Sequence, residues 1–218
     1  MAEPPSREST PGRPGRPARW SRADVVEAAR GIVAAEGVEA LTMRRVAREL
    51  GCSPMALYRH VRDKDELLAL LMDHVAAGLP RPDLPDDPRQ RLLVLWRLIH
   101  DALAEHSWAV GVLAQGDLAS PAVLWLVEEI LGGFVAAGLT VPKAGAAYRI
   151  VWQYTLGVLT IRHGSAGRAD DRPRLQRAML LDADPAELPL IAALAPKWPH
   201  DWDTYGEGLE ALLDGLLP

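Results

Sequence analysis

Apolar side chains recur every three to four residues along most of the chain, which is the period of an amphipathic helix. Residues with N-cap chemistry, Ser21, Thr42, Ser53 and Asp87, stand at the starts of four such segments. We expect helices over residues 21–36, 43–50, 54–60, 63–75, 87–103, 107–115, 120–138, 141–163 and 201–217. Since no segment alternates apolar and polar residues as a strand would, the sequence predicts an all-α fold.

The segment GCSPMALYRHVRDK, residues 51–64, departs from this pattern because its helix is short and mostly polar. Only Leu57 and Val61 hold an apolar stripe, so the rest of the helix is expected to face a polar partner. The preceding helix, the turn at Gly51 and this short helix together predict a helix-turn-helix.

Residues 1–19 repeat Pro, Gly and Arg and contain almost no large apolar side chain, so they cannot offset their ordering entropy. We expect a disordered arm, whose Gly-Arg-Pro repeats allow either a solvated basic tail or a minor-groove arm. The proline-rich residues 79–88 predict a domain boundary. A helix-turn-helix domain over residues 20–78 is then joined by a long helix to a larger helical domain over residues 86–218.

The charge is divided unevenly along the chain. Residues 1–64 hold twelve Lys and Arg against eight Asp and Glu, a net charge of +4, so the remainder carries −9. A basic N-terminal part attached to an acidic body favours local attraction to DNA. The single cysteine, Cys52, cannot form an internal disulfide, and no apolar run reaches the ~18 residues of a membrane span. We therefore expect a soluble cytoplasmic protein with no membrane partner.

The first 75 residues resemble the DNA-binding domain of the tetracycline-repressor (TetR) family of bacterial regulators. The resemblance is carried by GIVAAEGVEALTMRRVARELGCSPMALYRHVRDKDELL, a long and nearly gapless match. The body is similar to the C-terminal domain of the subgroup close to the tetracycline repressor through Tyr154-Thr155-Leu156-Gly157 and the closing YGEGLEALLDGL. The resemblance implies a homodimer joined by its late helices, a palindromic operator in double-stranded DNA, and a repressor that a small-molecule effector releases.

The family's DNA contacts, carried over by position, predict two groups of residues. The candidates for reading bases are Arg44, Pro54, Met55, Ala56 and Arg59. The candidates for phosphate contacts are Thr42, Tyr58, His60 and Lys64. Structural alternatives stay open for three of them, because Thr42 can cap its helix, Tyr58 can pack its ring, and His60 can bond to a carbonyl at a helix end.

The body is rich in large amphipathic side chains, which could line a ligand pocket or could pack in the core. We expect the effector to contact Trp96, His100, Trp125, Trp152 and Gln153. Pro80 and Ile161 stand where the tetracycline repressor has a drug-binding histidine and an acidic residue linked to magnesium. The predicted effector is therefore a small hydrophobic or aromatic molecule, and we expect no metal and no cofactor.

Two other functions compete with the regulator. The sequence HGSAG at residues 163–167 is a weak match to a hydrolase nucleophile elbow, but its first glycine is missing and a helix precedes it. The sequence contains no other catalytic motif, so we expect no enzymatic activity. An architectural DNA-binding module without an effector is the remaining alternative, and a tightly packed body would favour it.

Overall fold

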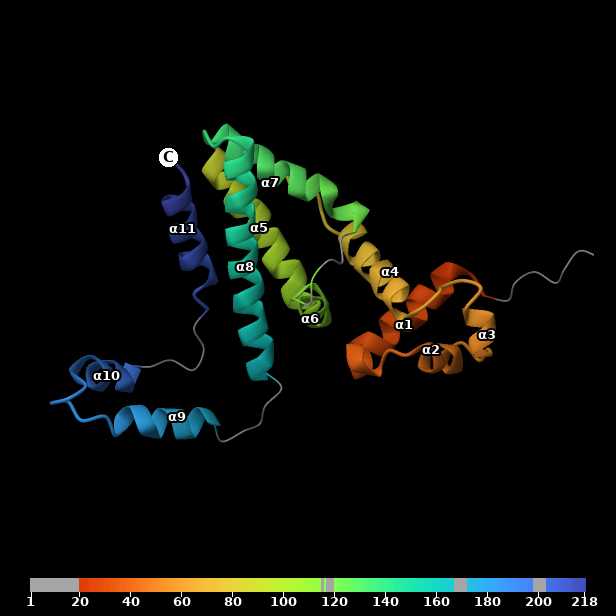
Figure 1. Cartoon of the computed structure of the whole chain (residues 1–218), viewed down its shortest axis with the longest axis horizontal. Coiled ribbons are helices and arrows are strands. Elements are labelled where there is room, and N and C mark those ends of the chain that lie inside the picture. Colours follow the sequence, from red (N-terminus) through yellow and green to blue (C-terminus); the bar gives the residue numbers. More distant parts are fainter. Residues whose placement is uncertain (1–19, 115, 117–119, 167–171, 198–202) are drawn as a thin grey trace, which may run out of the picture. The chain divides into compact units, whose positions relative to one another are not determined.

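The computed structural model describes residues 20–114, 116, 120–166, 172–197 and 203–218, and every regular element in these ranges is a helix (Figure 1). The α-helices are α1 (Arg22–Glu36), α2 (Met43–Glu49), α3 (Pro54–Leu57), α4 (Lys64–Ala77), α5 (Pro88–Glu105), α6 (Ser107–Ala114), α7 (Leu124–Ala136), α8 (Val141–Ala166), α9 (Arg172–Leu181), α10 (Pro189–Leu194) and α11 (Tyr205–Leu216). Single 3₁₀ turns occur at η1 (Val38–Ala40), η2 (Pro121–Val123) and η3 (Ala195–Lys197). The predicted all-α fold is confirmed.

The chain forms two compact units that divide within α4, one ending at Leu67 and the other beginning at Leu68. The helix α4 therefore contributes its first turn to one unit and its remaining residues to the other. Residues 79–88, predicted as a domain boundary, lead from α4 to α5 without a further helix. The arm lies outside the described residues, so its disorder and its minor-groove role stay predictions.

In the first unit, α1 begins at the capping box that the sequence predicts. The Ser21 hydroxyl accepts a hydrogen bond from the Asp24 amide at 3.2 Å, and the Asp24 carboxylate accepts one from the Ser21 amide at 2.7 Å. These hydrogen bonds from Ser21 hold the pKa of Asp24 below its ordinary value. The buried face of α1 consists of Val25, Ala29, Ile32 and Val33.

The turn between α2 and α3 is a Schellman motif. Gly51 has a φ of 61°, a left-handed conformation that favours glycine. Its amide donates to the carbonyl of Arg48 at 3.1 Å, and the amide of Cys52 donates to that of Ala47 at 2.9 Å. Ser53 then caps α3 through its hydroxyl. The sequence-predicted helix-turn-helix is present, and hydrogen bonds specify its geometry.

The helix α3 is shorter than its sequence pattern predicts, since it ends at Leu57 and not near His60. The amide of Arg59 bonds to the carbonyl of Ala56 at 3.4 Å, and that of His60 bonds to Leu57 at 2.9 Å. Both bonds reach three residues back in place of four, which tightens the end of the helix into a turn. Tyr58, Arg59 and His60 therefore lie on this turn and not on the helix.

The second unit packs α5 against α7, α8 and α11 around a common apolar core. Two glycines allow close approaches between these helices. A Cβ atom at Gly133 of α7 would lie 3.0 Å from Leu92 of α5, and one at Gly208 of α11 would lie 2.0 Å from the hydroxyl of Tyr154 of α8. A larger residue at position 208 would therefore force Tyr154 to move.

A buried hydroxyl joins three helices of this core. The Tyr205 hydroxyl on α11 donates to the carbonyl of Trp96 on α5 at 3.1 Å, and the Thr155 hydroxyl of α8 lies 3.1 Å from it. The ring of His100 stacks on Tyr205 with centroids 4.0 Å apart. Burial raises the pKa of Tyr205 to about 12. These contacts keep a polar group in the core satisfied and fix the position of α11.

The remaining helices, α9 and α10, contact one another and lie in a region for which the sequence pattern predicts no helix. By length and composition, no single helix in the described part of the chain qualifies as a membrane span. The bent pair Pro121–Ala136 and Val141–His163, with an angle of 120° between its halves, passes the same test only as a pair.

Candidate nucleic-acid interface and ligand cavity

The helix-turn-helix exposes the side chains that the sequence predicts to read bases. Met55 is 75% exposed although it is apolar. Arg44, Pro54 and Arg59 are exposed as well, while Ala56 is half-buried. The opposite side of α3 buries Leu57 in the core of the unit. This arrangement presents an outer surface of short apolar and cationic side chains.

The arginines near this surface fall into two classes. Arg45 is fixed on α2, since its guanidinium contacts Glu36 at 2.6 Å and Glu49 at 2.7 Å. The Glu36 and Glu49 carboxylates hold the pKa of Arg45 well above its ordinary value. Arg44 and Arg59, in contrast, make no ion pair with any described residue. Their guanidinium groups are available to an anionic partner, and that of Arg45 is not.

The residues predicted to contact phosphates have different surroundings. Tyr58 is 48% exposed, and its hydroxyl has no partner within the described ranges. The Thr42 hydroxyl caps α2 by accepting the amide of Arg45 at 3.1 Å, so the structural alternative for Thr42 is realised. The amine of Lys64 lies 3.5 Å from the carbonyl of Val38, at the limit of a hydrogen bond.

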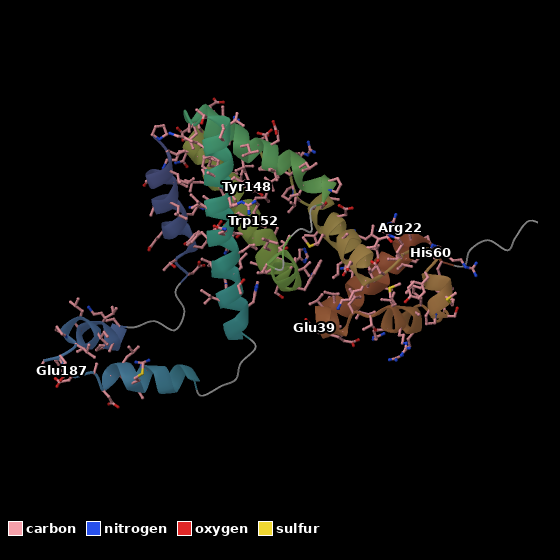
Figure 2. All side chains as sticks on the ribbon, viewed as in Figure 1. Arg22, Glu39, His60, Tyr148, Trp152 and Glu187 are labelled. Atoms are coloured by element: carbon pink, nitrogen blue, oxygen red, sulfur yellow. The ribbon has the colours of Figure 1, made fainter. Side chains whose placement is uncertain are left out.

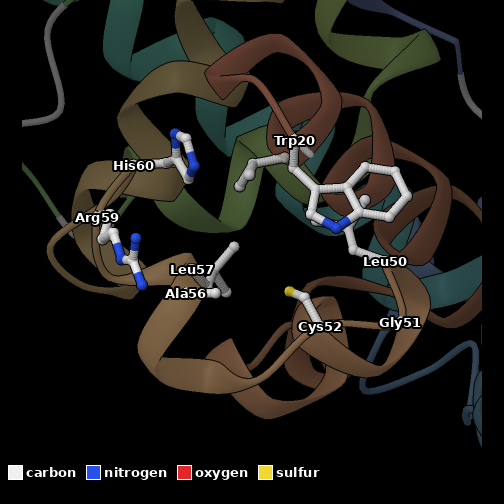
Figure 3. A pocket seen from close by; sticks show the side chains of 9 residues that line it. Trp20, Leu50, Gly51, Cys52, Ala56, Leu57, Arg59 and His60 are labelled. Carbon is white, nitrogen blue, oxygen red and sulfur yellow. The ribbon is translucent and has the colours of Figure 1, made fainter. Parts of the chain in front are cut away.

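A hollow of about 320 Å³ lies beside the turn that follows α3 (Figure 3). The ring of Trp20 forms one side, Cys52 and Leu57 line it, and Arg59 and His60 stand at another side. Cys52 is half-buried there and has a free thiol. The hollow leaves Arg59 and His60 room to change rotamer, so packing within the unit does not hold them in one conformation.

Glu66 ties the start of α4 to the start of α1. Its carboxylate contacts Arg22, which is labelled in Figure 2, at 2.5 Å. It also accepts a hydrogen bond from the backbone amide of Arg62 at 2.7 Å. The hydrogen bond from Arg62, followed by the nearby guanidinium groups, lowers the pKa of Glu66. Asp63 caps α4 through the amide of Glu66 at 2.8 Å. These bonds hold the first turn of α4 within the first unit.

The second unit contains a cavity of about 90 Å³. Five helices and the 3₁₀ turn η2 supply its lining, which is nearly all apolar. The lining residues are Met72, Val75, Ala76, Leu79, Ile99, Ala102, Leu103, Leu113, Ser120, Val123, Leu126, Val127, Tyr148 and Trp152. A cavity with this lining suits an apolar ligand.

Two aromatic residues of this lining, Tyr148 and Trp152, lie on α8 (Figure 2). Tyr148 and Trp152 stack with an interplanar angle of 7° and centroids 6.4 Å apart. Behind them, the ring of Trp96 lies 5.4 Å from that of Tyr148. Burial raises the pKa of the Tyr148 phenol. The lining therefore includes two nearly parallel aromatic rings and no charged side chain.

Of the five side chains predicted to bind the effector, only Trp152 lines the cavity. Trp96 is fully buried in the core, and His100 packs on Tyr205 with its Nε2 atom left without a partner. Trp125 lies under the guanidinium of Arg81, whose central carbon is 4.8 Å from the ring centroid. Gln153 is exposed. The effector contacts predicted for these four residues stay predictions.

The sequence did not single out Ser120 as a lining residue. Its hydroxyl is buried and makes two hydrogen bonds, one to Asp73 of α4 and one from the amide of Ala122 at 3.1 Å. The Ser-Pro pair that opens η2 is a recognisable capping signal, but capping alone does not indicate a cavity. In the described ranges, no three His, Cys, Asp or Glu side chains come together as metal ligands would.

Two protein-family models match this chain. The model described as bacterial regulatory proteins of the tetR family matches residues 25–71. The model described as the tetracyclin repressor-like C-terminal domain matches residues 81–218. The first matched segment contains the helix-turn-helix, and the second contains ten of the fourteen residues that line the cavity.

Individual proteins are similar to this chain over most of its length. The transcriptional repressor DrrR1 of Streptomyces coeruleorubidus is 32% identical over 216 residues, which cover 88% of this chain and 75% of that protein. The Streptomyces coelicolor TetR family protein ActR, solved in complex with actinorhodin, is 25% identical with a TM-score of 0.78, over 90% of this chain and 96% of ActR. BioQ, solved with its double-stranded DNA operator, is 27% identical with a TM-score of 0.65, over 91% of this chain and 98% of BioQ.

Proposed function

This chain belongs to the tetR family of bacterial regulatory proteins, and we propose that it represses transcription by binding a palindromic operator as a homodimer. A small hydrophobic or aromatic effector releases it from that operator. A helix-turn-helix regulator acts on chromosomal DNA, so the proposal places the protein in the bacterial cytoplasm, at the nucleoid when bound.

The observation that carries the proposal is the state of Arg44 and Arg59. Both residues are exposed and lack an ion pair among the described residues, whereas Arg45, which follows Arg44 on α2, is held by two carboxylates. An unpaired arginine can grip the O6 and N7 atoms of guanine with two parallel hydrogen bonds. Each such contact contributes about 1–3 kcal/mol of discrimination against a wrong base.

The uncharged side chains at the start of α3 complete the proposed reading surface. Pro54, Met55 and Ala56 carry no charge, and their apolar atoms suit the methyl group of thymine in the major groove. Met55 in particular exposes most of its surface to solvent in the isolated unit, which DNA would cover. These three residues add base preference without competing for phosphate.

The proposed phosphate contacts are Thr42, Tyr58, His60 and Lys64, which position the helix-turn-helix but do not read sequence. Tyr58 is the strongest of the four, because its exposed hydroxyl lacks a partner in the described structure. Thr42 can contact a phosphate only through the hydroxyl that already caps α2. BioQ, a relative with the same fold, is solved with its operator, which supports DNA as the partner.

The proposed dimer joins two chains through late helices that include α8 and α11. The described part of α8 exposes Val141, Ile150 and Ile161, which are apolar and would gain from burial against a second copy. A twofold dimer places two reading surfaces about 34–36 Å apart, one turn of B-DNA. The expected operator is therefore an inverted repeat.

The effector site in this proposal is the cavity of the second unit. Its volume of about 90 Å³ is below the roughly 300–1,000 Å³ of typical ligand pockets. A drug-sized effector therefore has to displace part of the lining, and α4 supplies three of the lining residues, Met72, Val75 and Ala76. Since α4 also contributes its first turn to the first unit, its displacement would alter operator binding. The effector must bind the two conformations unequally to have this effect.

Two alternatives lose support. Members of this family are non-enzymatic regulators, and residues 163–166 of the hydrolase-like sequence are helical where a nucleophile elbow needs a strand-to-helix turn. An architectural module without effector would have a tightly packed body, and the cavity argues against that. ActR, similar in fold over both units, is solved with the small molecule actinorhodin.

The test is a selection of bound sequences from random duplex DNA with the purified full chain, with its mass in solution measured in parallel. The proposal expects an enriched inverted repeat and a dimer. A monomer that enriches no sequence at moderate salt would contradict it. The enriched operator then allows candidate effectors to be scored by the concentration at which they release the protein.

A further inference from the structure

Ser120 is one of two hydroxyl-bearing residues in the mostly apolar lining of the cavity, the other being Tyr148. The residue is 5% exposed, and its hydroxyl has two partners among the described residues. Its one proton is donated to the Asp73 carboxylate, and one of its two lone pairs accepts the amide of Ala122 at 3.1 Å. Among the described residues, the second lone pair of the Ser120 oxygen has no partner, so it can accept a hydrogen bond from a ligand.

These two hydrogen bonds decide which role the Ser120 hydroxyl can take toward a ligand. Ser120 can accept a hydrogen bond from a ligand, but it cannot donate one without breaking its bond to Asp73. The nearby carboxylate of Asp73 also opposes a second negative charge in an apolar cavity. A carbonyl, an ether or a carboxylate of a ligand therefore finds no complementary group at Ser120, whereas an O–H or N–H group does.

The aromatic residues of the lining favour a flat ligand. Tyr148 and Trp152 both line the cavity with ring planes that differ by 7°, and a flat aromatic molecule can stack on rings in this orientation. The Tyr148 hydroxyl has no partner in the described structure, and since it can both donate and accept, it does not discriminate between ligand groups. The discrimination falls to Ser120 and Asp73.

We propose that the cavity selects a flat, uncharged aromatic molecule whose hydroxyl or amino group donates a hydrogen bond to the oxygen of Ser120. This inference rests on the proposed function, because it names the ligand class of the same cavity. It adds a preference for hydrogen-bond donors to the expectation of an apolar or aromatic effector, and it assigns that preference to a residue pair outside the predicted ligand contacts.

Equilibrium dialysis of the full chain against three matched probes tests the inference. At neutral pH, 2-naphthol offers a donor, 2-methoxynaphthalene keeps the oxygen without its proton, and 2-naphthoate carries a charge. We expect 2-naphthol to bind about three- to ten-fold more tightly than the ether, the usual contribution of one hydrogen bond. We expect 2-naphthoate to bind at least about ten-fold more weakly than 2-naphthol, because its charge is buried without a partner.

Two substitutions locate the preference. Ser120→Ala should bring the affinities for 2-naphthol and the ether to within about two-fold of each other, since no acceptor remains. Asp73→Ala keeps Ser120 but frees its proton, so affinity for the ether should rise about three- to ten-fold. A merely structural role of the pair would not produce this gain. Ser107→Ala, an exposed serine of α6, is the matched control and should leave all three affinities unchanged.

Equal binding of 2-naphthol and the ether by the unaltered chain, or no binding of any probe, would overturn the inference. An unchanged preference in Ser120→Ala would do the same. The dialysis contains no DNA, so its failure differs from failure of the proposed function. If a ligand without a hydrogen-bond donor releases the protein from its operator, the proposed function stands and the proposed ligand class is refuted. If the cavity prefers donors but no operator is found, the ligand class stands and the proposed function is refuted.

Discussion

Tyr58 and Tyr205 carry the same hydroxyl group in opposite surroundings. Tyr58, in the first unit, is 48% exposed and its hydroxyl has no partner within the described residues. Tyr205, in the second unit, is 3% exposed and bonds to the carbonyl of Trp96, with the Thr155 hydroxyl 3.1 Å away. A polar group left exposed and unpaired in a folded unit is available for binding, whereas one that is buried and paired mainly supports the fold.

The same contrast applies to charge. On the helix-turn-helix, Arg44 and Arg59 are unpaired in the described structure, and they are the side chains that we propose to read bases. In the second unit, Asp73 is engaged with Ser120, and the pair restricts what the cavity accepts. The first unit thus offers its polar groups outward to DNA, and the second uses them inside, for stability and selection.

The largest expected effect comes from removing an unpaired arginine. Arg59→Ala should abolish the preference for the operator over scrambled DNA, because the proposed guanine contact is worth about 1–3 kcal/mol, and weak non-specific binding should survive. A gel-shift comparison of the two DNAs measures this. Arg30→Ala removes the same charge from α1, where Arg30 pairs with Glu27 at 2.6 Å, and should leave the preference intact. If Arg59→Ala keeps the preference, Arg59 does not read bases.

Removing one hydroxyl from each unit sharpens the comparison. Tyr205→Phe leaves buried partners without their bond and should lower the free energy of unfolding by about 1–3 kcal/mol, with little change in operator affinity. Tyr58→Phe should weaken DNA binding and leave stability unchanged. Urea unfolding and operator titration of both variants test this. The comparison fails if both variants lose stability equally.

Much of the first unit follows from local sequence, and much of the second does not. Ser21, Thr42 and Ser53 cap their helices as predicted, because capping depends on residues within one turn. The predicted end of α3, near His60, is wrong by about a turn. Nothing in the sequence signals that the amides of Arg59 and His60 bond to carbonyls three residues back instead of four.

The cavity could not be derived from periodicity because side chains from well-separated segments meet there. Trp152 lines it, but Trp96 and His100, which share its aromatic character, pack in the core, and Gln153 faces outward. Composition therefore indicates that aromatic residues gather in the second unit, and only tertiary packing separates lining from core. Ser120 becomes visible as a ligand contact only once Asp73 is beside it.

A smaller effect is expected from Lys64, whose amine is only loosely engaged with Val38. Lys64→Ala should weaken binding to operator and scrambled DNA alike, and it should reduce the slope of log affinity against log salt by about one unit. Titrations at several salt concentrations measure the slope. An unchanged slope would remove Lys64 from the phosphate contacts.

The smallest expected effects concern how the stability of the two units changes with pH. Hydrogen bonds to Arg62 and Arg45 hold the pKa values of Glu66 and Glu36 below 4.5, so their contribution to stability is present above pH 4.5 and is lost as pH falls through the lowered values. The Tyr205 pKa is raised from 10.0 to about 12, so its contribution is present below pH 10 and is lost as pH rises toward 12.

Thermal unfolding across pH tests these two limits. Glu66→Gln should flatten the acid side of the stability profile, and Tyr205→Phe should flatten the alkaline side. If each substitution instead lowered stability by the same amount at every pH, these ionisations would have no part in the profile.

The most direct test of the account is the affinity of the full chain for the selected inverted repeat relative to a scrambled duplex of the same composition, at one near-physiological salt concentration. The account predicts a dimer that prefers the repeat by about a thousand-fold or more, as expected for a sequence-specific regulator. Equal affinity for the two duplexes would contradict it, because the helix-turn-helix surface would then attract DNA by charge alone.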